Sequence, residues 1–362
     1  MLLRSFPFAK VMSLPTVLLA SNAKCEALFH KGSSDYLVIT FNDMTMLRNG
    51  INFWGEALAK SGDLNCMSVM TAASNWFPAE AVEQLIPAMR PVIEEFRLRK
   101  PGGKIVLFGH SMGGYAAARF GALLEADVAI AFCPQYSIDP LITGEHDVRY
   151  RDFFHREEHR DHTVTADHLA RRTFVVYDPG HDQDRWNVSH IAALSKSITL
   201  IPVFHTGHET IRVAASSTFM TSFVKCAIDG DVLGMAKLLR QAKKQNDLFL
   251  ARLGETALRK GHIAAANTLA DRLGDIRRPL HPDAILIGSE LCKFTGRFET
   301  AATFLDMAIE MQKSKFLIVK KAELYAMAGN RIQASFLLDA LRDEFKDHCD
   351  YQTVEHILGT PA

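Results

Sequence analysis

Six short apolar runs alternate with helical sequence between residues 34 and 208, and this alternation constrains the fold more than any other feature. Several runs, such as Ile105 to Phe108, are apolar without interruption, which is typical of strands buried on both faces. The pattern predicts an α/β fold in which helices cover both faces of a mostly parallel sheet. The expected strands are Tyr36 to Phe41, Asn65 to Thr71, Lys104 to Gly109, Asp127 to Phe132, Thr173 to Tyr177 and Ile198 to Phe204.

The sequence pattern divides the chain into two parts. Strands are expected only before about residue 226, and helical sequence follows, so we expect an α/β domain over 1–226 and an all-helical domain over 227–362. A long polar stretch at 137–171, rich in His, Arg and Asp, separates the fourth expected strand from the fifth. Long connections are commonly functional, so we expect a lid-like insertion there.

The helical part contains a repeat of 34 residues. Three sets of positions recur at that spacing: Gly254, Gly288 and Ala322; Ala257, Leu291 and Tyr325; and Ala270, Phe304 and Leu338. Further small residues follow at similar spacing, namely Gly261, Gly296 and Gly329 at the expected turns, then Ala266, Ala301 and Ala334. The pattern resembles the tetratricopeptide repeat, although the Trp of that family is absent. The resemblance implies a concave surface for a protein partner or for self-association.

A serine lies in the turn between the third apolar run and the helical sequence after it. The strand Lys104 to Gly109 leads into Gly109-His110-Ser111-Met112-Gly113-Gly114, and a helical run from Tyr115 to Leu124 follows. A serine hydroxyl becomes a nucleophile when a tight turn lifts it out of the sheet and holds it near a base. The glycines supply the small neighbours that such a turn needs, so Ser111 is the predicted nucleophile.

This strand, turn and helix resemble the nucleophile turn of the α/β-hydrolase superfamily, and the resemblance covers about residues 34–225. It implies a triad of Ser, then Asp or Glu, then His, with the His on the loop after the last core strand. The last expected strand is followed by His205-Thr206-Gly207-His208-Glu209. The Gly-His pair frequent in the superfamily selects His208 as the base, whereas the competing His205 lies too near the end of the strand.

Three aspartates compete for the role of the triad acid. The resemblance places the acid after the strand Thr173 to Tyr177, where Asp178, Asp182 and Asp184 follow. Asp178 begins an Asp-Pro turn and Asp184 precedes an arginine as if paired with it, so either can be structural. We rank Asp182 first, because the superfamily usually places its acid a few residues past the strand. Only one of the three is expected to orient the imidazole.

An acyl-transfer intermediate needs two backbone N–H groups for its oxyanion. Met112, directly after the nucleophile, supplies one, and the turn Phe41-Asn42-Asp43-Met44 is expected to supply the other. This turn departs from the superfamily's common His-Gly pair. Asn42 tolerates the left-handed conformation that such turns require, so the site can survive the change. Whether Asn42 or Asp43 gives the donor stays open.

Three further residues follow expected strands on the same side of the sheet as Ser111. Trp76 lies in Asn75-Trp76-Phe77-Pro78, and Gln135 and Tyr136 follow the strand that ends at Phe132. We expect these side chains to contact the substrate, with packing in the core or at the pocket rim as the alternative.

A short histidine motif is compatible with zinc but lacks a complete ligand set. Residues His155 to His159 read H-x-x-E-H, a pattern of zinc proteases. The segment is strongly polar and no separate third ligand is evident, so we expect a solvated helix and no metal. A serine nucleophile with a histidine base needs no cofactor, and none is expected.

Charge and cysteine usage narrow the compartment and the partners. The 41 basic and 41 acidic side chains give zero formal net charge, which argues against nucleic acid as a partner. The six cysteines occur singly, as expected of reduced thiols in a cytoplasmic protein. The apolar run Met12 to Ala20 can alternatively be interpreted as a secretory signal, but this run is short and contains Pro15. No run approaches the ~20 apolar residues of a membrane span.

These features predict a serine hydrolase that cleaves an ester or related acyl bond through a Ser-His-Asp triad and an acyl-enzyme. The expected substrate is a small molecule or a glycan-linked acyl group. An acyltransferase that uses the same triad is one alternative. The other is a non-catalytic scaffold that binds a protein through its repeats, which the unusual Asn42-Asp43 turn and the ambiguous acid motivate.

Overall fold

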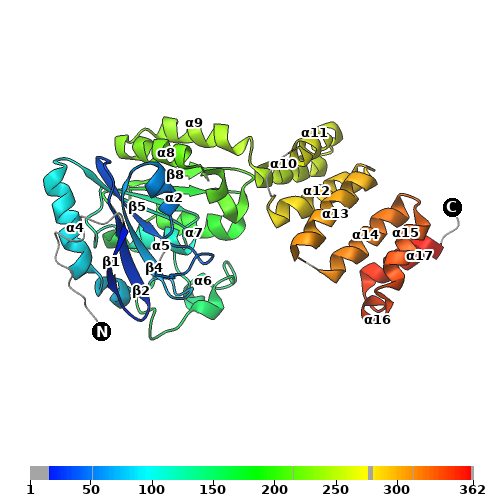
Figure 1. Cartoon of the computed structure of the whole chain (residues 1–362), viewed down its shortest axis with the longest axis horizontal. Helices are drawn as coiled ribbons and strands as arrows, with labels where there is room; N and C mark the ends of the chain where they lie inside the picture. Colours follow the sequence, from blue (N-terminus) through cyan, green and yellow to red (C-terminus); the bar gives the residue numbers. More distant parts are fainter. Residues whose placement is uncertain (1–15, 51, 215, 276–279, 313, 360–362) are drawn as a thin grey trace. The chain divides into compact units, whose positions relative to one another are not determined.

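The computed structural model describes residues 16–359, except 51, 215, 276–279 and 313, and divides into two compact units (Figure 1). The first unit is Met1–Lys243 and the second is Lys244–Ala362. The boundary expected after residue 226 falls inside α8 (Ser217–Asp229). The buried Phe223 of α8 packs against the sheet, so α8 and the next helix, α9 (Val232–Lys243), belong to the first unit.

One mixed sheet of eight strands organises the first unit. Its strand order is β1-β2-β4-β3-β5-β6-β7-β8. β2 pairs antiparallel with both β1 and β4, and all the other neighbours are parallel. With helices on both faces, this is the α/β-hydrolase fold. The strands are β1 (Thr16–Ser21), β2 (Cys25–His30), β3 (Tyr36–Phe41), β4 (Asn65–Thr71), β5 (Lys104–His110), β6 (Val128–Phe132), β7 (Arg172–Tyr177) and β8 (Ile198–Pro202).

The α/β prediction is confirmed, and the six expected strands are β3 to β8, with ends that agree within two residues. The sequence did not predict β1 and β2. β1 is a partly exposed edge strand, and β2 reads Cys-Glu-Ala-Leu-Phe-His, which lacks the β-branched residues that mark strands. The apolar run Met12 to Ala20 enters β1 at Thr16, and its earlier part lies outside the described residues.

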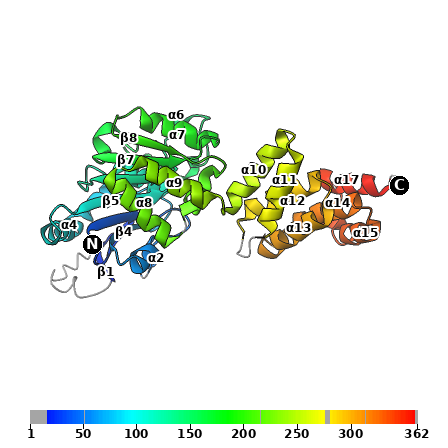
Figure 2. The same cartoon turned by 90° about the horizontal axis from the view of Figure 1, so that it is seen from above.

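Alternate side chains of each central strand divide between two hydrophobic cores. In β3, Leu37 and Ile39 belong to one core and Val38 to the other. The first core is covered by α3 (Ala79–Glu83), α4 (Ile86–Arg99) and α5 (Met112–Arg119), and α7 (Asp182–Ala192) packs beside it on β7. The second core is covered by α2 (Glu56–Ser61), α8 and α9, so helices flank the sheet on both faces (Figure 2).

The expected insertion at 137–171 contains three short helical turns and several buried side chains. The turns are α6 (Pro140–Thr143), η1 (Arg151–Phe153) and η2 (Ala166–His168). The solvated helix expected at His155 to His159 is wrong, because these residues form a turn in which His159 is 3% exposed. Its Nδ1 accepts the His155 N–H at 2.8 Å and its Nε2 lies 2.8 Å from the Asn75 carbonyl, so both ring nitrogens are occupied.

The second unit is helical throughout its described elements, as predicted. The 34-residue repeat corresponds to three consecutive helix pairs, α10 with α11, α12 with α13, and α14 with α15. Its elements are α10 (Asp247–Arg259), α11 (Ile263–Gly274), α12 (Pro282–Phe294), α13 (Phe298–Gln312), α14 (Lys315–Met327), α15 (Arg331–Asp339), α16 (Arg342–Phe345) and α17 (Cys349–Gly359).

The repeated glycines meet two different constraints, a left-handed turn at some positions and close helix packing at others. Gly261, Gly296 and Gly329 take φ of 77°, 75° and 79° at the turn within each pair, a conformation that favours glycine. A Cβ on Gly288 would lie 2.8 Å from Leu273 Cδ2 and 3.2 Å from the Phe304 ring. The repeat is therefore one of helix packing, and its assignment to the tetratricopeptide family stays a prediction.

Two simple observations complete the fold. All six cysteines fall in the described part of the chain and are free thiols. Among the helices between residues 16 and 359 that the structure describes, none has the length and apolar character that a bilayer span requires.

Candidate active site

Ser111 lies at a strained corner between β5 and α5. Its φ of 53° and ψ of −117° are unusual for a residue with a side chain, and its N–H donates to the Phe132 carbonyl at 2.9 Å. A Cβ on Gly109 would lie 2.1 Å from the Gly113 carbonyl oxygen, and one on Gly113 would lie 2.3 Å from that of Phe41. The corner therefore depends on both glycines, as the sequence indicated.

His208 reaches Ser111 from the loop after β8. Its Nε2 lies 2.8 Å from Ser111 Oγ, and it belongs to the 3-10 segment η3 (Gly207–Ala214). Asp178 holds this loop, because its carboxylate accepts the N–H groups of Thr206 and Gly207 at 2.7 Å each. Asp178 is thus a structural anchor, one of the roles considered for it. His205 lies instead beside the exposed Phe204.

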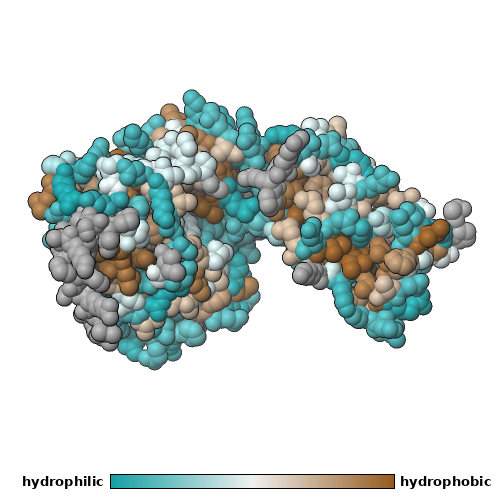
Figure 3. Space-filling model, viewed as in Figure 1, coloured by the Kyte–Doolittle hydropathy of each residue, from teal (hydrophilic) through white to brown (hydrophobic). Residues whose placement is uncertain are grey.

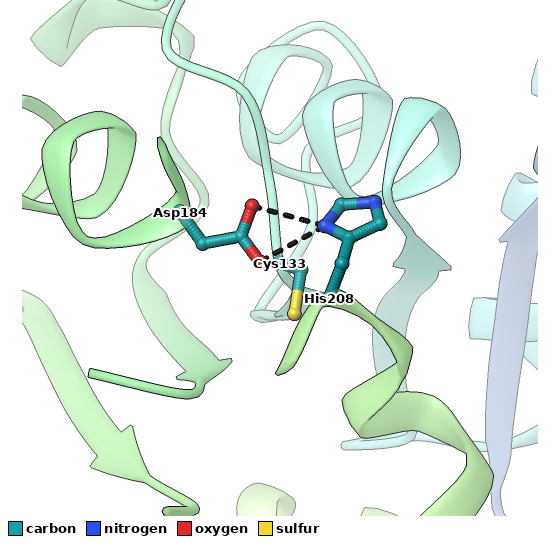
Figure 4. A group of neighbouring side chains, drawn as sticks. All are labelled: Cys133, Asp184 and His208. Atoms are coloured by element: carbon teal, nitrogen blue, oxygen red, sulfur yellow. Dashed lines mark hydrogen bonds and ion pairs between the residues drawn. The ribbon is translucent and has the colours of Figure 1, made fainter. Parts of the chain in front are cut away.

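Asp184, not Asp182, faces the imidazole. Both carboxylate oxygens of Asp184 lie 2.9 Å from His208 Nδ1, and Figure 4 shows the carboxylate pointing at that nitrogen. The ranking of Asp182 first is wrong: its side chain is 78% exposed and pairs with Arg185, the arginine that we had assigned to Asp184. Two residues along a helix turn the side chain by about 200°, so α7 points the two carboxylates in opposite directions.

Arg149 of the insertion extends this network, and sequence reasoning missed it. Its Nη2 donates to Asp184 at 3.0 Å, and its Nε and Nη2 donate to Asp147 at 2.8 and 2.7 Å. Its Nη1 lies 3.2 Å from His208 Nδ1. Asn187 of α7 also donates to Asp147, at 2.8 Å. The insertion is thus tied to the helix that carries Asp184, which no local pattern in a polar stretch reveals.

Tyr150 lies beside the Ser–His pair and was also missed. Its hydroxyl is 3.2 Å from His208 Nε2, the nitrogen that also lies 2.8 Å from Ser111 Oγ. The Trp76 ring packs on the phenol with centroids 4.7 Å apart, and Trp76 Nε1 donates to Gln135 Oε1 at 2.9 Å. Trp76 and Gln135 are fully buried, so they form the wall behind Tyr150, which corresponds to the packing alternative.

The other predicted substrate contact, Tyr136, packs on α7. Its ring lies 6.4 Å from Trp186 and 5.1 Å from His190 between centroids, and its N–H donates to Asn187 Oδ1 at 2.7 Å. Among the contacts of the described residues, none joins the side chain of Tyr136 to Ser111.

The expected oxyanion turn lies against the start of α5. Met112 is the first residue of α5, so its N–H has no partner within the helix. Asn42 does not take the positive φ that we expected of it. Its buried amide ties β3 to β4 instead, because Oδ1 accepts the Thr71 N–H at 2.8 Å and Nδ2 donates to the Asp43 carbonyl at 2.9 Å. The Asn42 side chain is therefore occupied by bonds within the fold.

The His110 side chain links the Asn42-Asp43 turn to the loop that carries His208. Its Nε2 lies 3.0 Å from the His208 carbonyl oxygen, and its Nδ1 lies 3.7 Å from the Asp43 carboxylate. Burial acts to raise the pKa of Asp43, but the hydrogen bonds from Thr45 and the nearby His110 ring hold that pKa at about 2. The Asn42-Asp43 turn, which was predicted to supply a backbone donor, therefore also carries the largely buried negative charge of Asp43.

The local charges suit a neutral base and an ionised acid. Burial lowers the pKa of His208 below its usual value, although Asp184 acts in the opposite direction. For Asp184 burial acts to raise the pKa, but hydrogen bonds from His181 and His208, with the charge of Arg149, hold it well below the usual range. At neutral pH the imidazole is therefore free to accept a proton.

Cys133 lies close enough to Asp184 and His208 that the three side chains could surround a metal ion (Figure 4). The fit is poor, because the Asp184 carboxylate and His208 Nδ1 already bond to each other. Burial also raises the pKa of the Cys133 thiol well above its usual value, whereas a metal needs the thiolate. The group is better described as part of the Ser–His–Asp arrangement.

A scan against protein-family models finds no match, and a search of curated proteins finds none either. Solved structures of α/β-hydrolase-type esterases, acyltransferases and peptidases are similar. The capsule O-acetyltransferase of Neisseria meningitidis serogroup A has 12% identity over 57% of this chain and 92% of its own, with a TM-score of 0.41. A carboxylesterase of Nitrososphaera gargenis has 13% identity over 59% and 100%, with a TM-score of 0.39. The acylaminoacyl peptidase of Pyrococcus horikoshii has 12% identity over 59% and 41%, with a TM-score of 0.40. Identities this low assign no reaction and no substrate to the chain.

Proposed function

We propose that the chain is a serine hydrolase that cleaves an ester or related acyl bond through a covalent Ser111 intermediate. One observation carries the proposal: Ser111 Oγ, the His208 ring and the Asp184 carboxylate form a continuous hydrogen-bonded line, with steps of 2.8 and 2.9 Å. Three residues that are 97 and 24 positions apart in the chain meet in the order that nucleophilic catalysis requires. This geometry argues against the non-catalytic scaffold.

In the acylation step, His208 Nε2 takes the proton of Ser111 as Oγ bonds to the acyl carbon. The electron pair of the carbonyl moves to its oxygen, which the N–H of Met112 and a backbone N–H of the Asn42-Asp43 turn would stabilise. Asp184 holds the Nδ1 proton and stabilises the imidazolium. Collapse of the intermediate breaks the bond to the leaving group, which takes the proton from Nε2.

Deacylation runs the same steps with an incoming oxygen. A water molecule gives its proton to His208 Nε2 and bonds to the acyl carbon, and Ser111 leaves with the returned proton. A sugar hydroxyl or an amine in place of water would make the chain an acyltransferase. The small-molecule or glycan-linked substrate and the cytoplasmic location remain predictions from the sequence.

Turnover of p-nitrophenyl acetate tests the proposal. The wild type is expected to show burst kinetics or steady release of p-nitrophenolate, and Ser111→Ala is expected to lose ~10³-fold or more. Ser222→Ala is the matched control, because Ser222 Oγ bonds only within its own helix α8, to the Thr218 carbonyl. Turnover that survives in Ser111→Ala would contradict the assignment.

For the helical unit we propose a docking role, as the repeat pattern predicts. The observation in its favour is apolar exposure: Ile332 and Phe336, one turn apart on α15, are 85% and 74% exposed. Apolar side chains also gather over α13 and α14 in Figure 3.

A second copy of the chain is the occupant to test. We expect the sedimentation coefficient of the wild type to rise with protein concentration, and that of the double variant Ile332→Asp/Phe336→Asp to stay constant. A wild type that remains a monomer at every concentration would contradict self-association.

A further inference from the structure

We propose that Tyr150 is a further catalytic residue, whose hydroxyl donates a hydrogen bond to the oxygen that leaves in acylation and enters in deacylation. The inference rests on the proposed function of Ser111 and His208. It is carried by position, because the phenol oxygen lies 3.2 Å from His208 Nε2, the same nitrogen that Ser111 Oγ approaches to 2.8 Å.

The position of His208 Nε2 fixes where that oxygen must be. Nε2 delivers the proton to the leaving oxygen and takes it from the incoming one, so either oxygen must come within about 2.6–3.2 Å of it. The Tyr150 hydroxyl already lies at that distance from the same nitrogen. A substrate oxygen that comes within reach of Nε2 therefore lies next to the Tyr150 O–H.

The phenol is fixed by its neighbours. The centroid of the Trp76 ring lies 4.7 Å from that of the Tyr150 ring, and the Arg149 guanidinium lies 4.9 Å from the same Tyr150 centroid. Both neighbours are anchored, since Trp76 donates to Gln135 and Arg149 donates to Asp184. A hydroxyl held in this way needs little reorganisation during the reaction, which is what makes a hydrogen-bond donor effective in catalysis.

The hydroxyl also keeps its proton under working conditions. Burial raises the pKa of Tyr150 to about 12. At neutral pH the group is thus a donor, and it retains its proton throughout the cycle. In acylation the C–O bond of the ester breaks, the leaving oxygen takes the proton from His208 Nε2, and the Tyr150 O–H stabilises the negative charge that develops on that oxygen before the proton arrives.

The test compares two esters with the same acyl group and different leaving oxygens. Removal of the hydroxyl in Tyr150→Phe should lower kcat/KM for an alkyl acetate by ~10–100-fold, since the poor alkoxide leaving group needs the donor. The p-nitrophenyl ester, whose leaving group is stable without help, should lose less than ~3-fold. Tyr36→Phe is the matched control, because Tyr36 is a buried tyrosine at the start of β3, at the opposite end of the strand from Asn42.

Labelling of Ser111 by a fluorophosphonate separates the possible failures. Tyr150→Phe should still be labelled, which shows that the site is folded. An equal loss of kcat/KM for both esters would overturn the role of Tyr150, and so would a gain in rate, which would mark the phenol as an obstruction. In either case, labelling and wild-type turnover would leave the proposed function of Ser111 in place. A wild type that neither reacts with the label nor turns over either ester would overturn both.

Discussion

The two units encode their structures in different ways. In the helical unit, small residues recur at spacings of 33 to 35 positions, and each is explained by its own backbone turn or by contacts within its own and the neighbouring helix pair. In the sheet unit, the candidate site joins Ser111, Asp184 and His208 from three separate connections, and adds Arg149 and Tyr150 from an insertion. A periodic packing surface can be read from local spacing, whereas a site assembled from distant segments depends on side-chain direction.

The largest expected effect comes from replacing each of the two aspartates of α7 in turn. Asp184→Asn should lower kcat/KM by ~10³–10⁴-fold, because the amide cannot hold the required tautomer of His208. Asp182→Asn should change it by less than ~2-fold, because that carboxylate is exposed and pairs with Arg185. Steady-state kinetics on an activated ester measures both. Equal losses in the two variants would mean that the distinction between the carboxylates is wrong.

The helical unit should respond to a single methyl group at a repeat position. Gly288→Ala should destabilise it by about 1–3 kcal/mol, because the new Cβ would lie 2.8 Å from Leu273 Cδ2 and 3.2 Å from the Phe304 ring, and both side chains are buried with little room to move. Gly274→Ala is the control: a Cβ there meets no atom of the described residues within 4 Å, so a gain of about 0.4–1 kcal/mol is expected. Urea unfolding followed by circular dichroism reports both changes. A Gly288→Ala variant as stable as wild type would show that the repeat positions are not packing constraints.

The smallest expected effect is a shift in the pH profile. Activity needs neutral His208, so kcat/KM should rise with pH through the pKa of His208, which burial places below its usual value. Arg149→Met removes a positive charge next to the ring and should raise that pKa, which moves the acid limb of the profile to higher pH. Six ionisable groups face the ring: Asp184 and His181 from α7 and its cap, Arg149 and Tyr150 from the insertion, His110, and Cys133.

A neighbouring arginine provides the control for this shift. Arg151, in the same insertion, bonds to the Gly144 carbonyl and to Glu145 rather than to the triad. The profile of Arg151→Met should therefore overlay that of the wild type. An acid limb that moves to lower pH in Arg149→Met would contradict the assigned electrostatic effect.

The sequence predicted what depends on local rules. Buried strands such as β5 and β6 contain continuous apolar runs, because both of their faces are covered. The glycines around Ser111 marked the corner, because a Cβ at Gly109 or Gly113 would clash with the backbone. The acid was misassigned because its direction depends on where α7 begins, and helix ends are weakly encoded. Tyr150 lies in a polar stretch whose role appears only when it folds onto Trp76.

The central claim is that Ser111 is a nucleophile activated by His208, and covalent labelling tests it most directly. After reaction with a fluorophosphonate, peptide mass spectrometry should find one adduct per chain, on Ser111, and its formation should slow markedly in His208→Gln. An adduct on another serine, or a folded protein that stays unlabelled at high reagent concentration, would contradict the account.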